Sequence, residues 1–255
     1  MQRIFTQHNL VLAALFLLAL PVFCWLQWQP KAWFQAQLEA NGLSEKISYA
    51  SVEKSFPGLH LNQANIALPE GKSLALDEVR FHPSISSLLH GEPALYLHAT
   101  NQGIEAESII AQNDGRLSLH DLMLTADAGS LAHFDSRLIL LGLKGGLSLK
   151  GELVLQAADG LPVDGDLKLE WAHPSSTMLP AGADHIQLSL ATTDAEGDKV
   201  WSWKIISQPE GLGGEGKLMA GSPDIRQWLL RGTMRMVKSQ PDSILSGTLG
   251  APHWQ

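Results

Sequence analysis

Three glycines in the chain have the spacing of a nucleotide-binding loop. Gly211, Gly213 and Gly216 satisfy the pattern G-x-G-x-x-G, which in dinucleotide-binding proteins opens a helix whose N-terminus receives the pyrophosphate. Here the residues that follow alternate between polar and apolar, as in a strand, so we interpret these glycines as part of a hairpin or bulge. Gly71–Ser73 resembles the end of a phosphate-binding loop, but Ile66 stands where that loop requires its first glycine. Neither motif predicts nucleotide binding.

The ten histidines are the next candidates for chemistry, because histidine serves both as metal ligand and as general base. No two of them have H-x-x-x-H spacing, and the single cysteine, Cys24, excludes thiolate metal sites and internal disulfides. His82, His90 and His98 recur every eight residues, but a turn divides them, which favours solvated histidines on a polar face. No G-x-S-x-G elbow occurs, and the carboxylates show no convergent pair. We therefore expect no catalytic residue, no metal site and no cofactor; an enzyme with polar groups converging inside the fold stays as an alternative hypothesis.

The charge balance bears on one class of partner. The chain carries 18 basic and 26 acidic side chains, for a net charge of −8. A nucleic-acid surface needs clustered lysine and arginine to displace counterions. The composition therefore argues against nucleic-acid partners.

The first 30 residues predict a transmembrane helix. Asn9–Trp28 holds no charged residue, and Leu10–Trp28 would extend about 28 Å as a helix, enough to cross a hydrocarbon core. The run is longer than the apolar part of a usual signal peptide, and no small-x-small cleavage site follows it, so we expect an uncleaved anchor. The anchor residues are Leu10, Leu15, Phe16, Leu18, Trp25 and Trp28.

Residues 31–46 predict an amphipathic connecting helix. Within Lys31–Gly42, one broad side carries Trp33, Phe34, Leu38 and Ala40, and Gly42 is a suitable stop. Trp25, Trp28 and Trp33 stand where an aromatic belt belongs. We expect this helix to lie at the membrane surface or to plug the end of the following domain.

From Ile47 onward, segments with a period of two recur between turn signals such as Asn113-Asp114-Gly115. A change of phase near Asp121 predicts a bulge. We expect a short helical turn at Pro83–Gly91, a short helix or loop at Pro241–Gly250, and no assigned structure at Ser130–Ser136. The predicted strands are Leu59–Leu68, Ser73–Phe81, Ala94–Ala99, Ile104–Gln112, Arg116–Ala126, Leu147–Ala157, Gly165–Trp171, His185–Ala191, Val200–Ile206, Gly213–Met219 and Trp228–Val237.

Short turns between strands imply an antiparallel meander, and about ten strands exceed a comfortable flat sheet. We therefore predict a mainly β fold: the N-terminal transmembrane helix, then one antiparallel sheet that curls into a groove or an open barrel-like form, with few short helices. Residues 47–255 show no linker composition and are expected to form one domain.

Alternation separates an apolar face from a polar one. Lys150, Glu152 and Lys168 fall on the face that is expected to meet water. For the tryptophans of the opposite face, an ordinary core position and a ligand groove are both open. The candidate groove-lining residues are Leu147, Leu149, Leu153, Leu155, Leu167, Leu169, Trp171, Trp201 and Trp203.

Two parts of the chain resemble known families. Ser55–Ala99 is similar to the N-terminal segment of AsmA-like proteins, in which a strand pair is followed by a turn of the form psl-sLL-G-P and a further strand. Residues 140–156 and 167–180 look like the second half of the type II secretion system protein N family. The residues that match the turn are Pro83, Ser84, Leu88, Leu89, Gly91 and Pro93.

The resemblance implies a place and a role. Residues 1–30 would be an inner-membrane anchor with a short cytoplasmic N-terminus, and residues 47–255 would lie in the periplasm. The chain would be a non-enzymatic component of the type II secretion system whose partners are the inner membrane and other inner-membrane subunits of that system. The alternative is an AsmA-like module that binds or transfers lipid, with acyl chains held against an apolar concave face.

Overall fold

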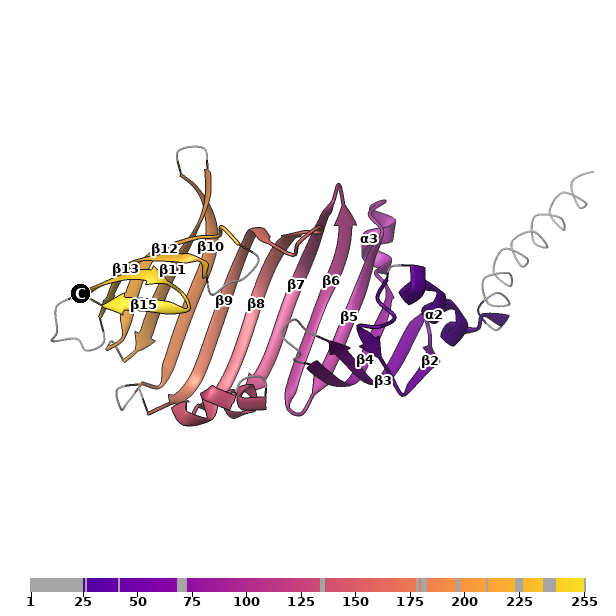
Figure 1. The fold of residues 1–255 in the computed structure, drawn as a ribbon, viewed down its shortest axis with the longest axis horizontal. Helices are drawn as coiled ribbons and strands as arrows, with labels where there is room; N and C mark the ends of the chain where they lie inside the picture. Colours follow the sequence, from indigo (N-terminus) through magenta and orange to yellow (C-terminus); the bar gives the residue numbers. More distant parts are fainter. Residues whose placement is uncertain are drawn as a thin grey trace, which may run out of the picture.

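The computed structural model describes residues 25, 27–40, 42–67, 73–133, 136–177, 179, 183–195, 198–209, 211–222, 227–235 and 242–254. Its main feature is one 15-stranded antiparallel sheet that stays open and curls along its length (Figure 1). From β3 onward each strand pairs with its neighbour in the sequence, while β1 and β2 both pair with β3 at one edge. The predicted mainly β, curled antiparallel fold is confirmed.

The strands at the start of the sheet are short, and those in its middle are long. They are β1 Ile47–Ser48, β2 Ser51–Ser55, β3 Gly58–Ala67, β4 Ser73–Pro83, β5 Ala94–Asn101, β6 Ile104–Asn113, β7 Arg116–Asp127, β8 Lys144–Gln156, β9 Pro162–Ser175, β10 His185–Ala195, β11 Asp198–Gln208, β12 Gly213–Met219, β13 Leu229–Arg235, β14 Ser243–Thr248 and β15 Ala251–Trp254. The helical elements are α2 Pro30–Ala40, α3 Ile85–Leu89, η2 Ala128–His133 and η3 Ser136–Leu141.

Within the residues just given, no helix combines the length and the apolar composition that a membrane crossing requires. Of the predicted anchor residues, Trp25 and Trp28 are described, and Leu10, Leu15, Phe16 and Leu18 lie outside the described residues.

Two-residue turns explain why the long strands form a meander. Asn113 pairs with Arg116 across a turn in which Asp114 and Gly115 have φ of 47° and 73°. Gln102 and Gly103 repeat this geometry between β5 and β6, with φ of 37° and 87°. Positive φ at both central residues gives the twist that joins adjacent antiparallel strands tightly.

The bulge predicted near Asp121 is present in β7. The β7–β8 register shifts between Leu119 and Leu122, and Asp121 has φ of 50°. The buried Ser108 on β6 donates a hydrogen bond of 2.9 Å from its hydroxyl to the carbonyl oxygen of His120, which satisfies a group that the bulge removes from the ladder. Because of the extra residue, apolar side chains on both sides of the bulge stay on the same face.

The segment Pro241–Gly250 departs from its prediction as helix or loop. It contains β14, which pairs with β13 and with β15. Leu245 is buried in a core cluster while its neighbour Ile244 is exposed, so the segment alternates as a strand does. The segment forms a strand because it pairs with β13 and β15, and this pairing is not visible in the local sequence. Of the segment Ser130–Ser136, which had no assignment, residues 130–133 lie in η2 and Ser136 begins η3.

Candidate functional site

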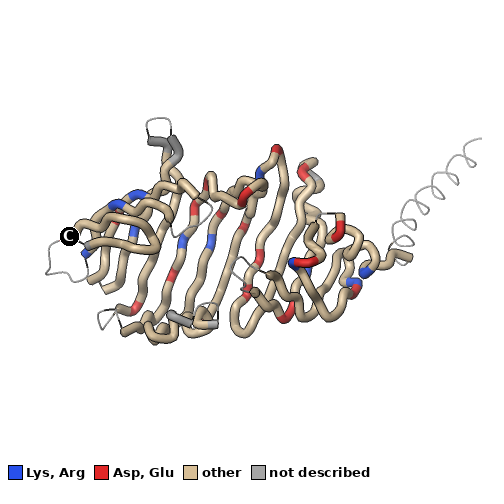
Figure 2. Tube along the Cα trace, viewed as in Figure 1, with Lys and Arg blue, Asp and Glu red and all other residues tan. Residues whose placement is uncertain are grey.

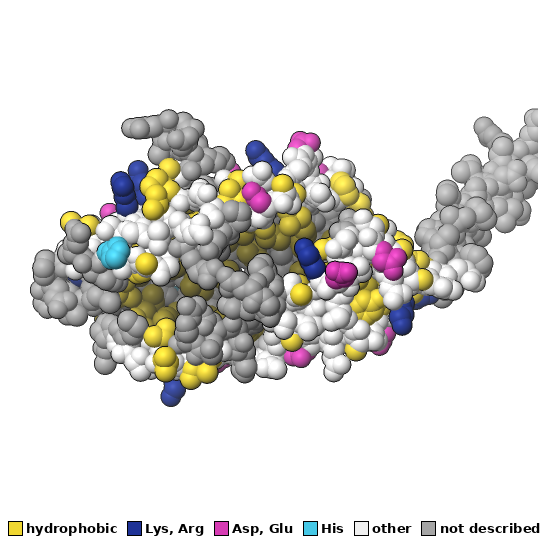
Figure 3. Space-filling view, viewed as in Figure 1, with side chains coloured by type: hydrophobic (Ala, Val, Ile, Leu, Met, Phe, Trp, Pro, Cys, Tyr) yellow, Lys and Arg dark blue, Asp and Glu magenta, His cyan; other side chains and the backbone are white. Residues whose placement is uncertain are grey.

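The apolar face of the curled sheet forms a trough, which we take as the candidate functional site. Strand pairing aligns its side chains in rows that cross several strands: Leu124 faces Leu149, Leu149 faces Leu169, and Leu169 faces Leu188. A parallel row joins Leu147 to Trp171. Figure 3 shows apolar side chains on the floor of a hollow in the middle of the molecule.

The nine candidate groove-lining residues all lie on this face, but in two environments. Leu147, Leu149, Leu155, Leu167 and Leu169 are half-buried in the middle of the trough, on β8 and β9. Trp171 is also half-buried, and its indole nitrogen donates a hydrogen bond of 2.9 Å to the carbonyl oxygen of Lys144. Leu153 packs against the core cluster described next.

Trp201 and Trp203 belong to the closed C-terminal end of the trough. They are 3 % and 5 % exposed and form a core cluster with Leu218, Trp228, Leu230 and Leu245. Both are therefore core aromatics, placed where the trough ends. Trp228, which the sequence pattern did not single out, packs with Trp201 at a ring separation of 6.3 Å and donates to the carbonyl oxygen of Ser222 at 2.7 Å.

Glycines make room for one of these tryptophans. Gly214, Gly216 and Gly232 line up on β12 and β13 under the indole of Trp203. A Cβ on Gly216 would come within 2.8 Å of the Trp203 ring, and one on Gly232 within 2.5 Å. Gly216 of the G-x-G-x-x-G pattern thus lies inside a strand, where the absence of a side chain lets a ring approach the backbone.

The opposite end of the trough is closed by α2. Leu38 of α2 is buried, and Phe34 packs against a second core cluster formed by Leu59, Leu61, Ala64, Val79 and Ala99. The helix ends in a Schellman motif: the amide of Leu43 donates to the carbonyl of Leu38 at 2.8 Å, that of Gly42 donates to Glu39 at 3.1 Å, and Gly42 has φ of 64°. This helix was expected to lie at the membrane surface or to plug the end of the following domain. The packing of Phe34 against the core cluster agrees with the second placement.

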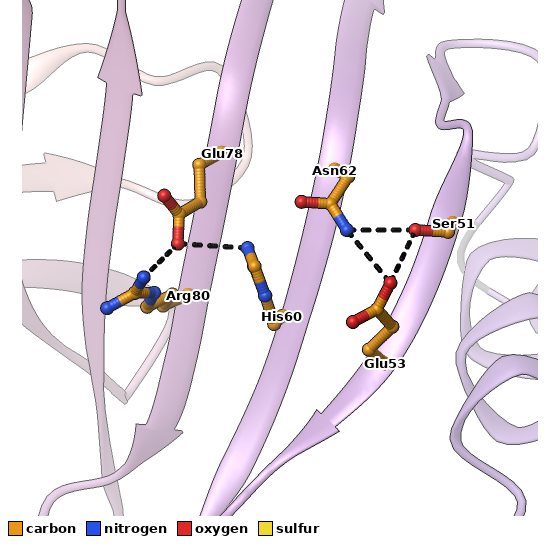
Figure 4. A network of polar contacts seen from close by, with 6 residues as sticks. All are labelled: Ser51, Glu53, His60, Asn62, Glu78 and Arg80. Carbon is orange, nitrogen blue, oxygen red and sulfur yellow. Dashed lines mark hydrogen bonds and ion pairs between the residues drawn. The ribbon is translucent and has the colours of Figure 1, made fainter.

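The outer face of the sheet carries the charged residues. Figure 2 shows charged residues along most of the strands, with Lys and Arg more frequent over β11–β13 and Asp and Glu more frequent over β5–β7. On β3 and β4, His60 Nε2 lies 2.9 Å from Glu78 Oε1, and Arg80 contacts the same oxygen (Figure 4). Asn62 on β3 donates at 2.9 Å to Ser51, which extends the polar surface toward β2.

Two further polar pairs lie on the next strands. The Tyr96 hydroxyl donates to Glu107 at 2.5 Å, and His98 Nε2 lies 2.8 Å from Glu105 Oε1. The hydrogen bond to Glu107, together with partial burial, raises the pKa of Tyr96 to about 12. Sequence reasoning placed His98 on a polar face but missed its carboxylate partner, because the pair depends on strand register.

Across the described part of the chain, no group of three or more histidine, cysteine, aspartate or glutamate residues is arranged to hold a metal ion. What the site offers is an apolar surface with two closed ends and a half-exposed middle. Comparison with protein-family models, with curated proteins and with solved structures yields no match for the chain.

Proposed function

We propose that this chain is a non-enzymatic component of the type II secretion system, anchored in the inner membrane by residues 1–30 with residues 47–255 in the periplasm. Support comes from the similarity of Ser55–Ala99 to AsmA-like proteins and of residues 140–156 to the protein N family. The uncharged run Asn9–Trp28 supports the anchor. The protein would act by contact with other inner-membrane subunits of the system.

The observation that carries the proposal is a set of large apolar side chains exposed at the ends of the strands. On one rim are Ile85 and Leu88 of α3 together with Leu95 at the start of β5. On η3, which follows β7 and precedes β8, Ile139 and Leu140 are exposed as well. Exposed apolar clusters of this kind are typical of surfaces that bind other proteins.

The sheet edges are less suited to binding. At one edge, β15 has only four residues, and Pro252 among them has no amide hydrogen to offer. At the other, β1 and β2 are short, and α2 packs beside β2. Short strands and proline are the usual protection of an edge against strand addition. We therefore place the contacts on the rims.

A secretion assay tests this proposal. Deletion of the gene should abolish export of the usual type II substrates, and the wild-type chain should restore it. A chain with Ile139→Ser and Leu140→Ser should restore export poorly. Ile244→Ser, which changes an apolar side chain exposed on β14, is the matched control and should restore export fully. Normal export in the deletion strain would contradict the proposal.

A second candidate function, lipid binding, has its own observation. The leucines in the middle of the trough are only half-buried, although the core clusters at both ends are sealed. An acyl chain laid along them would remove apolar surface from water at roughly 25 cal/mol per Å². An acyl chain that moves from a bilayer into the trough exchanges one apolar environment for another. Such a module would therefore shield a lipid from water but would not extract it strongly from a bilayer.

Mass spectrometry of the purified full chain tests lipid binding. The wild type should carry phospholipid, and Leu149→Glu, which places a carboxylate on the trough floor, should carry much less. Ser189→Glu is the matched control, because Ser189 is on the outer face opposite Lys168 and Lys204, where a carboxylate is well placed. Equal lipid content in the two variants would speak against a lipid-filled trough.

A further inference from the structure

An aromatic cluster lies on the outside of the closed N-terminal end. Trp25 and Trp28 have ring centroids 5.2 Å apart, and Trp28 and Trp33 are 5.4 Å apart. Phe56, at the turn between β2 and β3, meets Trp25 edge-on at 5.6 Å. We call Trp25, Trp28, Trp33 and Phe56 the aromatic patch. It joins two parts of the chain that are distant in sequence.

Part of the aromatic patch is exposed to solvent although a core cluster lies close to it. Phe34 of α2 and Trp28 pack against the core cluster of β3 and β4, and Leu38 of α2 is buried. Phe56 is nevertheless 79 % exposed and Trp33 is 44 % exposed. Exposing a phenylalanine costs roughly 1.5–3 kcal/mol relative to burying it. Exposed apolar side chains that gather in one place are typical of a surface that binds a membrane or another protein.

A lysine fixes the turn to the chain before α2. Lys54 on β2 donates from Nζ to the carbonyl oxygen of Trp25 at 3.1 Å. Lys31 follows within the first turn of α2. Two lysines thus stand close in sequence to residues of the patch, Lys31 before Trp33 and Lys54 before Phe56.

We propose that the aromatic patch inserts into the headgroup region of a phospholipid bilayer, so that Phe56 anchors the β domain to the membrane beside the tryptophans. The occupant follows from the chain itself: the uncharged run Asn9–Trp28 ends at the patch. Tryptophan is enriched at the depth of lipid headgroups, and lysine near the surface is attracted to anionic lipids. The inference rests on the anchor of the proposed function.

The consequence is an orientation. A helix alone leaves a domain free to swing about its attachment point, whereas a second contact through Phe56 holds the closed N-terminal end against the membrane. The trough then begins at the bilayer surface and extends away from it.

The test measures how deeply Phe56 lies when the full chain is in a membrane. In a background with Cys24→Ser, Phe56→Cys carries a nitroxide label, and the chain is reconstituted into vesicles of phosphatidylcholine and phosphatidylglycerol. Paramagnetic resonance then compares collisions of the label with oxygen, which concentrates in lipid, and with a nickel complex, which stays in water. Leu140→Cys is the matched control, because Leu140 on η3 is 80 % exposed.

We expect the label at position 56 to be several-fold less accessible to the nickel complex than the label at position 140. A label at Trp33→Cys should behave like the one at position 56. Equal nickel accessibility at positions 56 and 140 in a chain that floats with the vesicles would overturn the patch and leave the anchor standing. A chain that fails to float would overturn the anchor and, with it, the patch.

Discussion

Replacing Gly232 by alanine should destabilise the protein because of Trp203. A Cβ on Gly232 would lie 2.5 Å from Cζ2 of that indole and 2.8 Å from the Cα of Gly216, and it would also overlap the carbonyl oxygen of Glu215. Carbon atoms in favourable contact are about 3.5–4.0 Å apart. The new methyl group therefore requires a shift of about 1 Å by a ring that is 5 % exposed.

The expected loss follows from two opposing contributions. Overpacking a filled core costs about 1–3 kcal/mol, and the shift at Gly232 is large, so the upper part of that range applies. Replacing glycine by alanine also lowers the conformational entropy of the unfolded chain, and this stabilises the protein by about 0.4–1 kcal/mol. The net loss in free energy of unfolding should be about 2 kcal/mol, or roughly 4–8 °C in Tm for a chain of this size.

Gly146→Ala is the matched control. Gly146 lies in β8 of the same sheet, and a Cβ there would meet no atom within 4 Å. Only the stiffening of the unfolded chain remains, so this variant should gain about 0.4–1 kcal/mol. Urea unfolding of the detergent-solubilised chain, followed by circular dichroism, measures both. If Gly232→Ala were as stable as Gly146→Ala, Trp203 would not rest on the glycines as described.

Three further outcomes are expected. Leu59→Ala, at the sealed N-terminal end, should cost about 3 kcal/mol of unfolding free energy, and Leu149→Ala, in the open trough, about 1 kcal/mol, because only the first leaves a closed cavity; similar losses in urea unfolding would mean that the chain fills its own trough. Tyr96→Phe should cost about 1 kcal/mol at neutral pH; the native phenol keeps its proton up to a pKa of about 12 while the unfolded one loses it near 10, so this difference should shrink as pH rises through that window, and a constant difference would contradict the hydrogen bond to Glu107. Ser207→Ala removes the buried hydroxyl that accepts from two loop amides, and a thermal melt should show a loss of about 2 kcal/mol; an unchanged melting temperature would mean that water replaces the hydroxyl.

Local signals in the sequence were enough for the strands β3 to β13 of the long meander, but not for β14 and β15. The Asp114-Gly115 turn and the phase change at Asp121 each depend on a few adjacent residues, and both appear in the structure as predicted. Alternation also assigned Leu149 and Leu169 to one face, where the register places them opposite each other.

Features that depend on register were out of reach. Nothing in the pattern of β12 and β13 shows that Gly216 and Gly232 come together beneath Trp203, because each glycine alone suggests a turn. The pairing of His98 with Glu105 across two strands is of the same kind. Alternation also cannot tell a half-exposed leucine from a sealed one, since that difference arises from the curl of the whole sheet and from α2 at its end.

The pairing of every strand from β3 onward with its neighbour in sequence has a consequence for how the fold arises. A chain that is synthesised from its N-terminus can lay each new strand on one that is already ordered. No segment has to wait for a distant partner, and loop closure stays inexpensive at each step. While the sheet grows, the edge to which the next strand will be added is unpaired. Other chains could pair with this edge, and the risk ends when the short strand β15 with Pro252 covers it.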